Sequence, residues 1–429
     1  MYFDIKNNPL NPLYNILLGK FHIFMSTTKV AIIKEGKTPP DMRVPLSPNQ
    51  CVEVQNSFPE IDLSIQSSMV RIFKDDEYAK LGLTVLDEVS EADVLFGVKE
   101  VPMNMLLENK TYFFFSHTTK EQPYNRELLR TILAKKIRMI DYEGLTNERG
   151  IRVIGFGYYA GIVGAYNGMM AWGKRTKSFD LCPALALTTM EDVAMELKKV
   201  KLPNIKIALT GAGRVAKGVL DVMEMMGIKK VSASDYLIKE FNEPVFTQLF
   251  VNDYNRRKDG KELPRQDFYV NYKDYNSDFF KFAKVTDLYI SGHFYAEHSP
   301  YIFTREEAKH PEFNIKVVAD ISCDIDGPIA STLRPSTIDD PLYGYDPVNE
   351  TETNFDAEKA ITVMAVDNLP CELPSVASEG FGKELIAHII PQLINGDKGD
   401  VLKRATIAEN GKLTEKYAYL QDYVDGNLK

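Results

Sequence analysis

The sequence predicts an α/β protein with two domains, each built on a mostly parallel sheet, and with a cleft between them. Short apolar runs alternate with helical patterns along most of the 429 residues, and such alternation produces parallel sheets. In the middle, residues 205–218, IKIALTGAGRVAKG, join an apolar strand, a glycine turn and the start of a helix. The length allows two to three domains, since one domain commonly takes about 100–200 residues.

Composition narrows the class of protein. Apolar residues make up 44% of the chain and charged residues 26%, as in ordinary globular proteins. The formal net charge of −9 argues against a nucleic-acid partner and against an anionic membrane surface. The cysteines lie far apart and form no C-x-x-C pair: Cys51, Cys182, Cys323 and Cys371. We therefore expect no disulfide framework and no metal site, and a reducing, cytoplasmic location.

The N-terminal stretch is unusual. Residues 13–25 are apolar but are interrupted by Asn15, Lys20 and His22. They are too few to span a bilayer, which takes about 20 residues, and they lack the small-residue cleavage site of a secretory signal. We expect residues 1–24 to be a disordered extension, or the result of a start codon assigned too far upstream.

The first domain is predicted from alternating strands and helices between residues 29 and 143. Ser47 and Pro48 mark one helix start, with serine as the N-cap and proline at the first helical position. Each strand is an apolar run with polar or helical neighbours. The predicted strands cover residues 29–35, 63–66, 93–98, 111–116 and 137–142, and further helices cover 75–81 and 125–136.

The glycine turn predicts a dinucleotide site in a Rossmann-like domain. Gly211, Gly213 and Ala216 form G-x-G-x-x-A between strand and helix. The first glycine permits the turn, the second lets backbone approach a pyrophosphate, and the helix start offers N–H groups to phosphate. A second strand over 231–235 is predicted to end in Asp235, 22 residues after Gly213, where an acidic side chain would accept from a ribose hydroxyl. There are two alternatives to a dinucleotide site: the turn could bind no ligand, or it could bind another nucleotide-like ligand.

Asp235 favours NAD over NADP, because a carboxylate would repel a 2′-phosphate. Lys229, Lys230 and Lys239 lie close by in the sequence and could accept that phosphate. NAD is therefore the expected cofactor, with NADP possible.

The other elements complete the predicted domains. Helices are expected over 157–177 and 190–200, and later strands over 287–292, 316–322 and 360–367. The charged residues 252–267 are expected to be a solvated insertion, and residues 324–358, rich in turn residues, a long ordered loop near the cofactor cleft. The last segment is placed back against the first domain. The expected domains are thus 25–155 plus 368–429, which carries the substrate site, and 156–367, which binds the dinucleotide.

Polar side chains follow successive strands of the first domain, where ligands of parallel sheets bind. Two arginines and two lysines at one edge of an acidic protein predict a receptor for a small polyanion. A lysine among cations can act as a general base, and histidine titrates near neutrality. Taken singly, each could instead be solvated or structural, and Glu100 could be a simple ion-pair partner. The residues are Arg43, Lys99, Glu100, His117, Lys120, Gln122, Asp141, Glu143 and Arg152.

Two more histidines, His293 and His298, follow the strand predicted over residues 287–292. They lie near where a nicotinamide could bind, but we expect structural roles for them.

The ordered set of motifs resembles the saccharopine dehydrogenases that release lysine, within the wider alanine dehydrogenase and transhydrogenase superfamily. The matching stretches run from about Lys29 to the C-terminus. They are M-R-V-P-L-S-P around Arg43, G-V-K-E at 97–100, S-H-T-T-K-E-Q at 116–122, D-Y-E at 141–143, R-V-I-G-F-G-Y-Y-A-G at 152–161, G-A-G-R at 211–214, V-A-D-I-S at 318–322 and D-N-L-P-C-E-L-P at 367–374.

The sequence also looks like the lysine–ketoglutarate reductase half of the bifunctional animal and plant enzyme. That half tends to carry Lys-Arg-Pro where this chain has Lys99-Glu100-Val101-Pro102, and Lys-Glu is the pattern of the free-standing NAD enzyme. We therefore expect an enzyme with one activity. A cysteine pair of some fungal members is replaced by Val215 and Gly292, so redox control by that pair is not expected.

The resemblance implies roles by position. Lys99 would be the general base and His117 the general acid, while Glu100 and Glu143 would offset positive charge. Saccharopine would contact Arg43, Lys99, Gln122 and Phe156. The cofactor site would be lined by Arg152, Gly211, Gly213, Arg214, Asp235, Asp320, Ile321, Ser322, Asp367, Asn368 and Leu369.

The function that the resemblance implies is reversible, NAD(P)-dependent oxidative deamination of saccharopine to lysine and 2-oxoglutarate. Its partners would be these small molecules, with no nucleic acid and no membrane. Two alternatives stay open: another amino-acid dehydrogenase of the superfamily, and a nucleotide-binding protein without activity.

Overall fold

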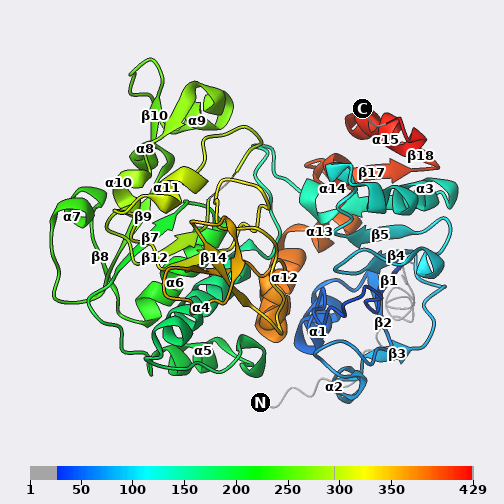
Figure 1. Ribbon diagram of the computed structural model, residues 1–429. Coiled ribbons are helices and arrows are strands. Elements are labelled where there is room, and N and C mark those ends of the chain that lie inside the picture. The colour runs from blue at the N-terminus through cyan, green and yellow to red at the C-terminus, as the bar shows by residue number, and fades with distance from the viewer. Residues whose placement is uncertain (1–26, 294, 428–429) are drawn as a thin grey trace, which may run out of the picture.

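The computed structural model describes residues 27–293 and 295–427 (Figure 1). The expected disordered extension, residues 1–24, lies outside the described residues. The chain forms two eight-stranded sheets and a separate two-stranded hairpin. Both large sheets are mostly parallel and carry helices on their faces, which confirms the predicted α/β fold with two Rossmann-like units. The domain limits 25–155 plus 368–429 and 156–367 stay a prediction.

The first sheet has the strand order β18-β17-β6-β5-β4-β1-β2-β3. Strands β1 to β6 pair in parallel, and β17 joins β6 in the antiparallel sense. The C-terminal strands therefore extend a sheet that begins at the N-terminal side of the described chain. The strands are β1 Thr28–Ile32, β2 Ile61–Gln66, β3 Thr84–Leu86, β4 Val94–Phe96, β5 Thr111–Phe114, β6 Arg138–Asp141, β17 Thr406–Glu409 and β18 Lys412–Leu413.

Helices from both ends of the sequence cover this sheet (Figure 1). Helix α1 begins after Ser47 as predicted, and the Ser47 N–H donates to Gln50 Oε1 at 3.0 Å. The helices of this unit are α1 Pro48–Ser57, α2 Asp75–Lys80, α3 Arg126–Ala134, α12 Pro374–His388, α13 Ile390–Ile394, α14 Val401–Ala405 and α15 Gln421–Asp425.

The second sheet has the strand order β15-β14-β16-β13-β12-β7-β9-β8. Its strands are β7 Lys206–Thr210, β8 Lys229–Lys230, β9 Val245–Leu249, β12 Leu288–Ser291, β13 Val317–Asp320, β14 Leu342–Asp346, β15 Thr351–Thr353 and β16 Ile361–Met364. Its helices are α4 Gly157–Thr176, α5 Met190–Leu197, α6 Arg214–Met225, α7 Ala233–Ile238, α10 Phe280–Ala283 and α11 Arg305–Lys309. Because β14 pairs antiparallel with β16, residues 324–358 are not the long loop that was expected.

The strand predicted over residues 231–235 is wrong. Strand β8 ends at Lys230, and Asp235 lies in the first turn of helix α7. The cause is local, since Ser232 Oγ accepts the N–H of Asp235 at 3.1 Å and so caps the helix. Strand β9, and not β8, pairs with β7. The place beside the glycine turn is therefore held by a strand that was not predicted.

The charged insertion at 252–267 is also more structured than expected. It begins in α8 Val251–Tyr254, continues as β10 Asn255–Arg257 and leads into α9 Gln266–Asn271. Strand β10 pairs antiparallel with β11 Tyr275–Ser277. Figure 1 shows this hairpin and α9 together, next to α8 at one end of the second sheet.

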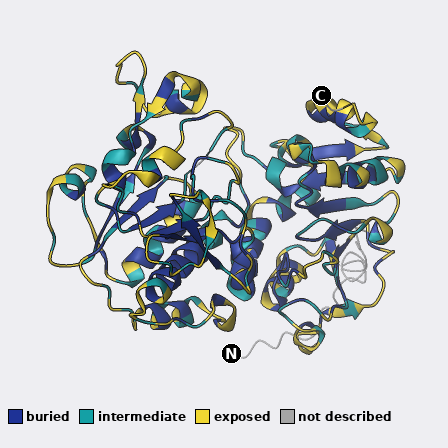
Figure 2. Cartoon of the chain, in the orientation of Figure 1, coloured by how far each residue is buried: buried dark blue, intermediate teal, exposed yellow. Residues whose placement is uncertain are grey.

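Burial follows the two sheets, whose strands are largely buried while the outer helix faces are exposed (Figure 2). Helix α4 is buried along most of its length and packs on α6. A Cβ atom at Gly161 would lie 2.0 Å from the Val215 carbonyl oxygen, and one at Gly218 would lie 2.1 Å from that of Tyr158. The two helices thus approach each other through glycine, which fixes α6 and the turn before it. Within the described ranges, no helix combines the length and apolar character needed to cross a bilayer.

Candidate functional site

The glycine turn has the geometry that a dinucleotide requires. Gly211 has φ of +116°, and a Cβ atom there would lie 2.1 Å from the Gly292 carbonyl oxygen, so only glycine fits. A Cβ atom at Gly213 would meet nothing within 4 Å, which leaves its backbone open to a ligand. The Gly211 N–H donates to the Leu249 carbonyl at 3.1 Å and holds the turn against the end of β9.

A cavity of about 850 Å³ opens over this turn. Its volume lies in the range of cofactor sites, about 300–1,000 Å³, so the residues present fit a dinucleotide. The cavity is lined by the segment before α4, the start of α6, the ends of β9 and β12, and α9. The lining residues are Ile151, Arg152, Gly155, Phe156, Gly157, Gly211, Ala212, Gly213, Arg214, Val215, Phe250, Val251, Tyr254, Arg265, Gln266, Tyr269, Gly292 and His293.

The cavity brings together some of the predicted cofactor residues and leaves others outside. Arg152, Gly211, Gly213 and Arg214 line it, together with Phe156, which was predicted for saccharopine. Two cofactor candidates, Asp320 and Asn368, have other partners in the structure. Asp235, Asp320, Ile321, Ser322, Asp367, Asn368 and Leu369 are not among the lining residues.

Asp235 has an ion-pair partner on its own helix. Its Oδ1 lies 2.9 Å from Lys239 Nζ, one turn further along helix α7. Since β8 is separated from β7 by β9, the position of Asp235 gives no structural reason to favour NAD over NADP.

Asp320 is buried in a network of hydrogen bonds at the end of β13. It accepts from the hydroxyls of Ser291 and Ser322 at 2.6 Å each and from that of Thr332 at 2.7 Å. The N–H groups of Ser322 and Cys323 donate to it as well, at 3.1 Å each. These bonds fix the backbone of the predicted segment Asp320 to Ser322.

A cluster of charged side chains adjoins this cavity and includes Arg43, which is buried and held by a carboxylate. Its Nη2 lies 2.6 Å from Asp41 Oδ2, and its Nε donates to Asp41 Oδ1 at 3.0 Å. Burial alone would raise the pKa of Asp41, but the Arg43 charge lowers it below its usual range. Nη2 also donates to Asn368 Oδ1 at 3.1 Å. Arg43 thereby links the first unit to the segment that follows β16.

Phe156 lies under Arg43 and inside the dinucleotide cavity. The guanidinium carbon of Arg43 lies 4.2 Å from the centroid of the Phe156 ring. The Phe156 ring also stacks on the ring of Phe381 in α12. The two rings are nearly parallel, and their centroids are 4.5 Å apart. These contacts fix the first residue before helix α4.

Glu100 joins two basic side chains, those of His117 and Lys37. His117 Nδ1 donates to Glu100 Oε1 at 2.5 Å, and Lys37 Nζ lies 2.9 Å from Glu100 Oε2. Burial would raise the pKa of Glu100, but the bonds from His117 and Lys37 lower it to about 2. Glu100 is therefore ionised near neutral pH, and it fixes the His117 ring with Nε2 free of this contact.

Lys99 is half-buried beside the same group. Burial lowers its pKa first, and the nearby charges of Arg43 and Lys37 lower it further. Its backbone N–H donates to Glu35 Oε2 at 2.9 Å. Burial, with the charge of Asp41, raises the pKa of Glu35 to about 8.

The remaining predicted residues lie around this cluster. Glu143 Oε1 lies 3.8 Å from Arg152 Nη2, and the Glu143 N–H donates to the buried Asp141 at 2.7 Å. The Gln122 side chain accepts from the exposed Tyr124 hydroxyl, and its backbone carbonyl accepts from Tyr423 at 2.6 Å. The catalytic and binding roles of all these residues stay predictions.

The two histidines after β12 differ. His293 Nδ1 lies 3.0 Å from Thr210 Oγ1, and burial lowers its pKa to about 4. Its Nε2 is buried and has no hydrogen-bond partner among the described residues. His293 also lines the cavity. His298 is largely exposed beside Glu297.

Several residues of the Arg43 cluster and of the cavity over the glycine turn were not predicted from the sequence. Asp41 could have been found, because it stands two positions before Arg43 with a single residue between them. Phe250, Arg265 and Tyr269 were missed because the insertion was expected to be solvated and the strand before it was not predicted.

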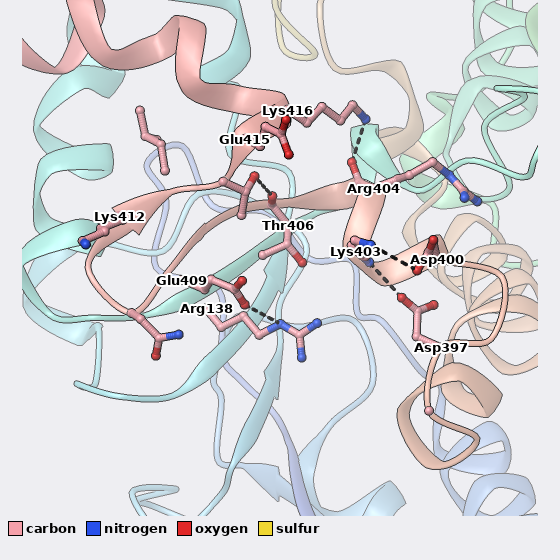
Figure 3. Close-up of a pocket in the computed structure, with 14 residues that line it drawn as sticks. Arg138, Asp397, Asp400, Lys403, Arg404, Thr406, Glu409, Lys412, Glu415 and Lys416 are labelled. Carbon is pink, nitrogen blue, oxygen red and sulfur yellow. Dashed lines mark hydrogen bonds and ion pairs between the residues drawn. The ribbon is translucent and has the colours of Figure 1, made fainter.

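A second cavity, of about 840 Å³, lies beside β17 and β18 (Figure 3). Its charged groups contact one another: Arg138 Nε lies 3.9 Å from Glu409, and Lys403 Nζ lies 3.8 Å from Asp400. Lys416 donates to the Arg404 carbonyl at 2.6 Å. None of the predicted site residues lines this cavity. In the described part of the chain, no group of three or more His, Cys, Asp or Glu residues could hold a metal ion.

Comparison with known proteins adds to this geometry. Residues 31–163 match the family model described as Alanine dehydrogenase/PNT, N-terminal domain. The solved structure of an L-alanine dehydrogenase aligns with a TM-score of 0.63 at 15% identity, over 94% of this chain and 100% of that chain. This likeness shows a shared fold.

Two curated relatives cover most of the chain. The mitochondrial alpha-aminoadipic semialdehyde synthase of Rattus norvegicus is 29% identical over 448 residues, which cover 91% of this chain and 47% of the relative. Saccharopine dehydrogenase (NAD(+), L-lysine-forming) of Schizosaccharomyces pombe is 26% identical over 358 residues, which cover 76% of this chain and 84% of the relative. The chain spans about half the length of the synthases that it matches.

Proposed function

The chain belongs to the alanine dehydrogenase and transhydrogenase superfamily and is related to the lysine-forming saccharopine dehydrogenases, and from this premise we propose that it converts saccharopine reversibly to lysine and 2-oxoglutarate with NAD(P). The observation that carries the proposal is the juxtaposition of Lys99, His117 and Arg43 with an adjoining cavity over the glycine turn.

Substrate carboxylates would bind at Arg43. Its Nε and Nη2 are used by Asp41 and Asn368, while Nη1 has no hydrogen bond to any described residue. A substrate carboxylate could therefore take that nitrogen without breaking the ion pair. Because Arg43 is buried, the bond would form in a medium of low dielectric constant, where a charge-assisted bond is strong.

Lys99 would act as the general base. Its lowered pKa increases the fraction of neutral amine near neutral pH, which is the form that can accept a proton. In the degradative direction it would take the proton from the secondary amine, release that proton to solvent, and then take one from the water that attacks the substrate imine.

His117 would act as the general acid. Glu100 accepts the hydrogen from its Nδ1, so Nε2 is the atom that can deliver a proton to the departing lysine amine. A dinucleotide bound over the glycine turn would supply the hydride chemistry at the glutamyl Cα, and Arg152, Gly211, Gly213 and Arg214 would hold it.

The test is to follow NADH and NADPH absorbance with lysine and 2-oxoglutarate together and with each alone. We expect oxidation only when both carbon substrates are present. Turnover with pyruvate plus ammonia instead would assign the chain to another amino-acid dehydrogenase, which the shared fold with L-alanine dehydrogenase makes the second candidate. Dinucleotide binding without any turnover would leave a binding protein and contradict the proposal.

A further inference from the structure

We propose that Arg265, stacked on Phe250 at the end of β9, binds the 2′-phosphate of an NADP-type dinucleotide, so that the chain selects NADP(H) over NAD(H). This inference rests on the dinucleotide site of the proposed function. It does not depend on which amino acid the enzyme converts.

The strand beside the glycine turn carries the residue that would contact the adenosine ribose. In a dinucleotide-binding sheet, one strand leads into the glycine turn, and the group that contacts this ribose lies near the end of the strand next to it. Here that neighbour is β9, which pairs with β7 over its full length. The Gln248 side chain donates to the Gly211 carbonyl at 3.0 Å, which ties the end of β9 to the turn. The residue that follows β9 is Phe250, where an acidic side chain would select NAD.

Arg265 lies over the ring of Phe250. Its guanidinium carbon lies 5.1 Å from the centroid of the Phe250 ring, and both side chains line the cavity. Stacking on an aromatic face orients the planar guanidinium and leaves its edge N–H groups free for a phosphate. Within the described residues, the Arg265 side chain has no ion pair and no hydrogen bond.

Arg265 differs from the other two arginines of the cavity, which have carboxylate partners. Of its three arginines, Arg152 lies 3.8 Å from Glu143 and Arg214 lies 3.3 Å from Glu384. Among the described residues, Arg265 is the cavity cation without such a partner. A doubly charged phosphate gains most from a cation that is not already neutralised.

Two nearby carboxylates, those of Asp253 and Asp267, are engaged elsewhere. Asp253 Oδ2 accepts the N–H of Phe250 at 2.7 Å. Asp267 pairs with Arg257 at 2.8 Å and accepts from the Tyr275 hydroxyl at 2.8 Å. No aspartate or glutamate lines the described cavity. The site thus offers a cation for a 2′-phosphate and no carboxylate for a free 2′-hydroxyl.

The experiment measures binding to the full chain without amino-acid substrates. Kd values for NADPH, NADH, 2′,5′-ADP and 5′-AMP are compared in the unchanged protein, in R265Q and in R256Q. Arg256 is the matched control, because it lies in the same insertion but outside the cavity and pairs with Asp278 at 3.2 Å.

We expect the unchanged chain to bind NADPH at least about tenfold more tightly than NADH, as one charge-assisted bond allows. R265Q should lose most of this preference, and the preference of 2′,5′-ADP over 5′-AMP, while its affinity for NADH stays within about twofold of the original. R256Q should keep both preferences.

Three results would overturn the inference: tighter binding of NADH by the unchanged chain, an R265Q variant with the same NADPH preference, or an equal loss of both dinucleotides in R265Q. A melting curve that matches the unchanged protein shows that R265Q is folded. If NADPH binds as expected but lysine and 2-oxoglutarate give no turnover, only the proposed reaction fails. If neither dinucleotide binds, both fail.

Discussion

Two compartments meet at Phe156, the cluster of Arg43, Lys99 and His117 and the cavity over the glycine turn, and they differ in where their carboxylates lie. In the cluster proposed to bind substrate, basic side chains have carboxylate partners, as in Arg43 with Asp41 and His117 with Glu100. The dinucleotide cavity is lined by glycine backbone and arginines, with no carboxylate in its described wall. Paired groups at fixed positions suit binding and proton transfer, whereas an open turn with cations suits phosphate. The four changes below test this contrast, from the largest expected effect to the smallest.

Replacing Lys99 with methionine should separate the compartments most strongly. Loss of a general base should lower kcat by about 100- to 10,000-fold, while the dinucleotide Kd should change little because Lys99 does not line that cavity. Steady-state kinetics and a binding titration check the two parts. K201M, at an exposed lysine between α5 and β7, is the control. Near-normal turnover in K99M would refute the role of Lys99.

Replacing Asp41 with alanine should lower stability. It leaves the buried Arg43 guanidinium without its carboxylate, and breaking a buried pair costs about 3 kcal/mol or more. Denaturant unfolding with linear extrapolation measures the change. E91Q breaks the exposed pair with Lys29 and should barely alter unfolding. If D41A and E91Q changed the free energy of unfolding equally, the buried pair of Asp41 and Arg43 would contribute no more to stability than an exposed pair.

Two glycine substitutions should separate folding from binding in the cavity. The methyl group added in G213A would have no neighbour within 4 Å, so this variant should fold normally. The same methyl group should weaken dinucleotide binding by about tenfold, equivalent to about 1.4 kcal/mol. G211A should instead lower the melting temperature, because its Cβ would lie 2.1 Å from a carbonyl oxygen. Thermal unfolding and a dinucleotide titration of both variants give the comparison. Unchanged affinity in G213A would place the pyrophosphate elsewhere.

Replacing Glu35 with glutamine should give an effect that is visible only in the pH dependence of stability. In the folded protein Glu35 keeps its proton up to about pH 8, whereas its ordinary pKa is 4.5. The folded state therefore binds more protons between these values, and stability falls as pH rises through them. E35Q cannot titrate, so its free energy of unfolding should fall less steeply between about pH 5 and 8. Parallel curves for the two proteins would contradict the raised pKa.

The sequence predicted the elements that depend on local pattern. The glycine turn, helix α4 and the helix start at Ser47 were found because their signals are continuous in the sequence. The polar residues after β4 and β5 could be grouped because parallel strands end at one edge.

The rest depends on pairing between distant segments. Residues 231–235 have the composition of a strand but form a helix, because the Ser232 cap competes with strand pairing. Which strand lies beside β7 is decided by tertiary packing, so β9 and Phe250 could not be recognised. Strands β14 and β15 were missed for the same reason, since turn residues hide their antiparallel pairing.

Phe156 is a wall common to both compartments. One face of its ring carries the Arg43 guanidinium, Phe381 stacks on the ring, and the residue also lines the dinucleotide cavity. If binding in one compartment shifts this ring, the other compartment changes shape without any movement of the sheets. Thermodynamic linkage would make such an effect reciprocal: the factor by which dinucleotide changes the affinity for the amino-acid substrate would equal the factor by which that substrate changes the affinity for dinucleotide.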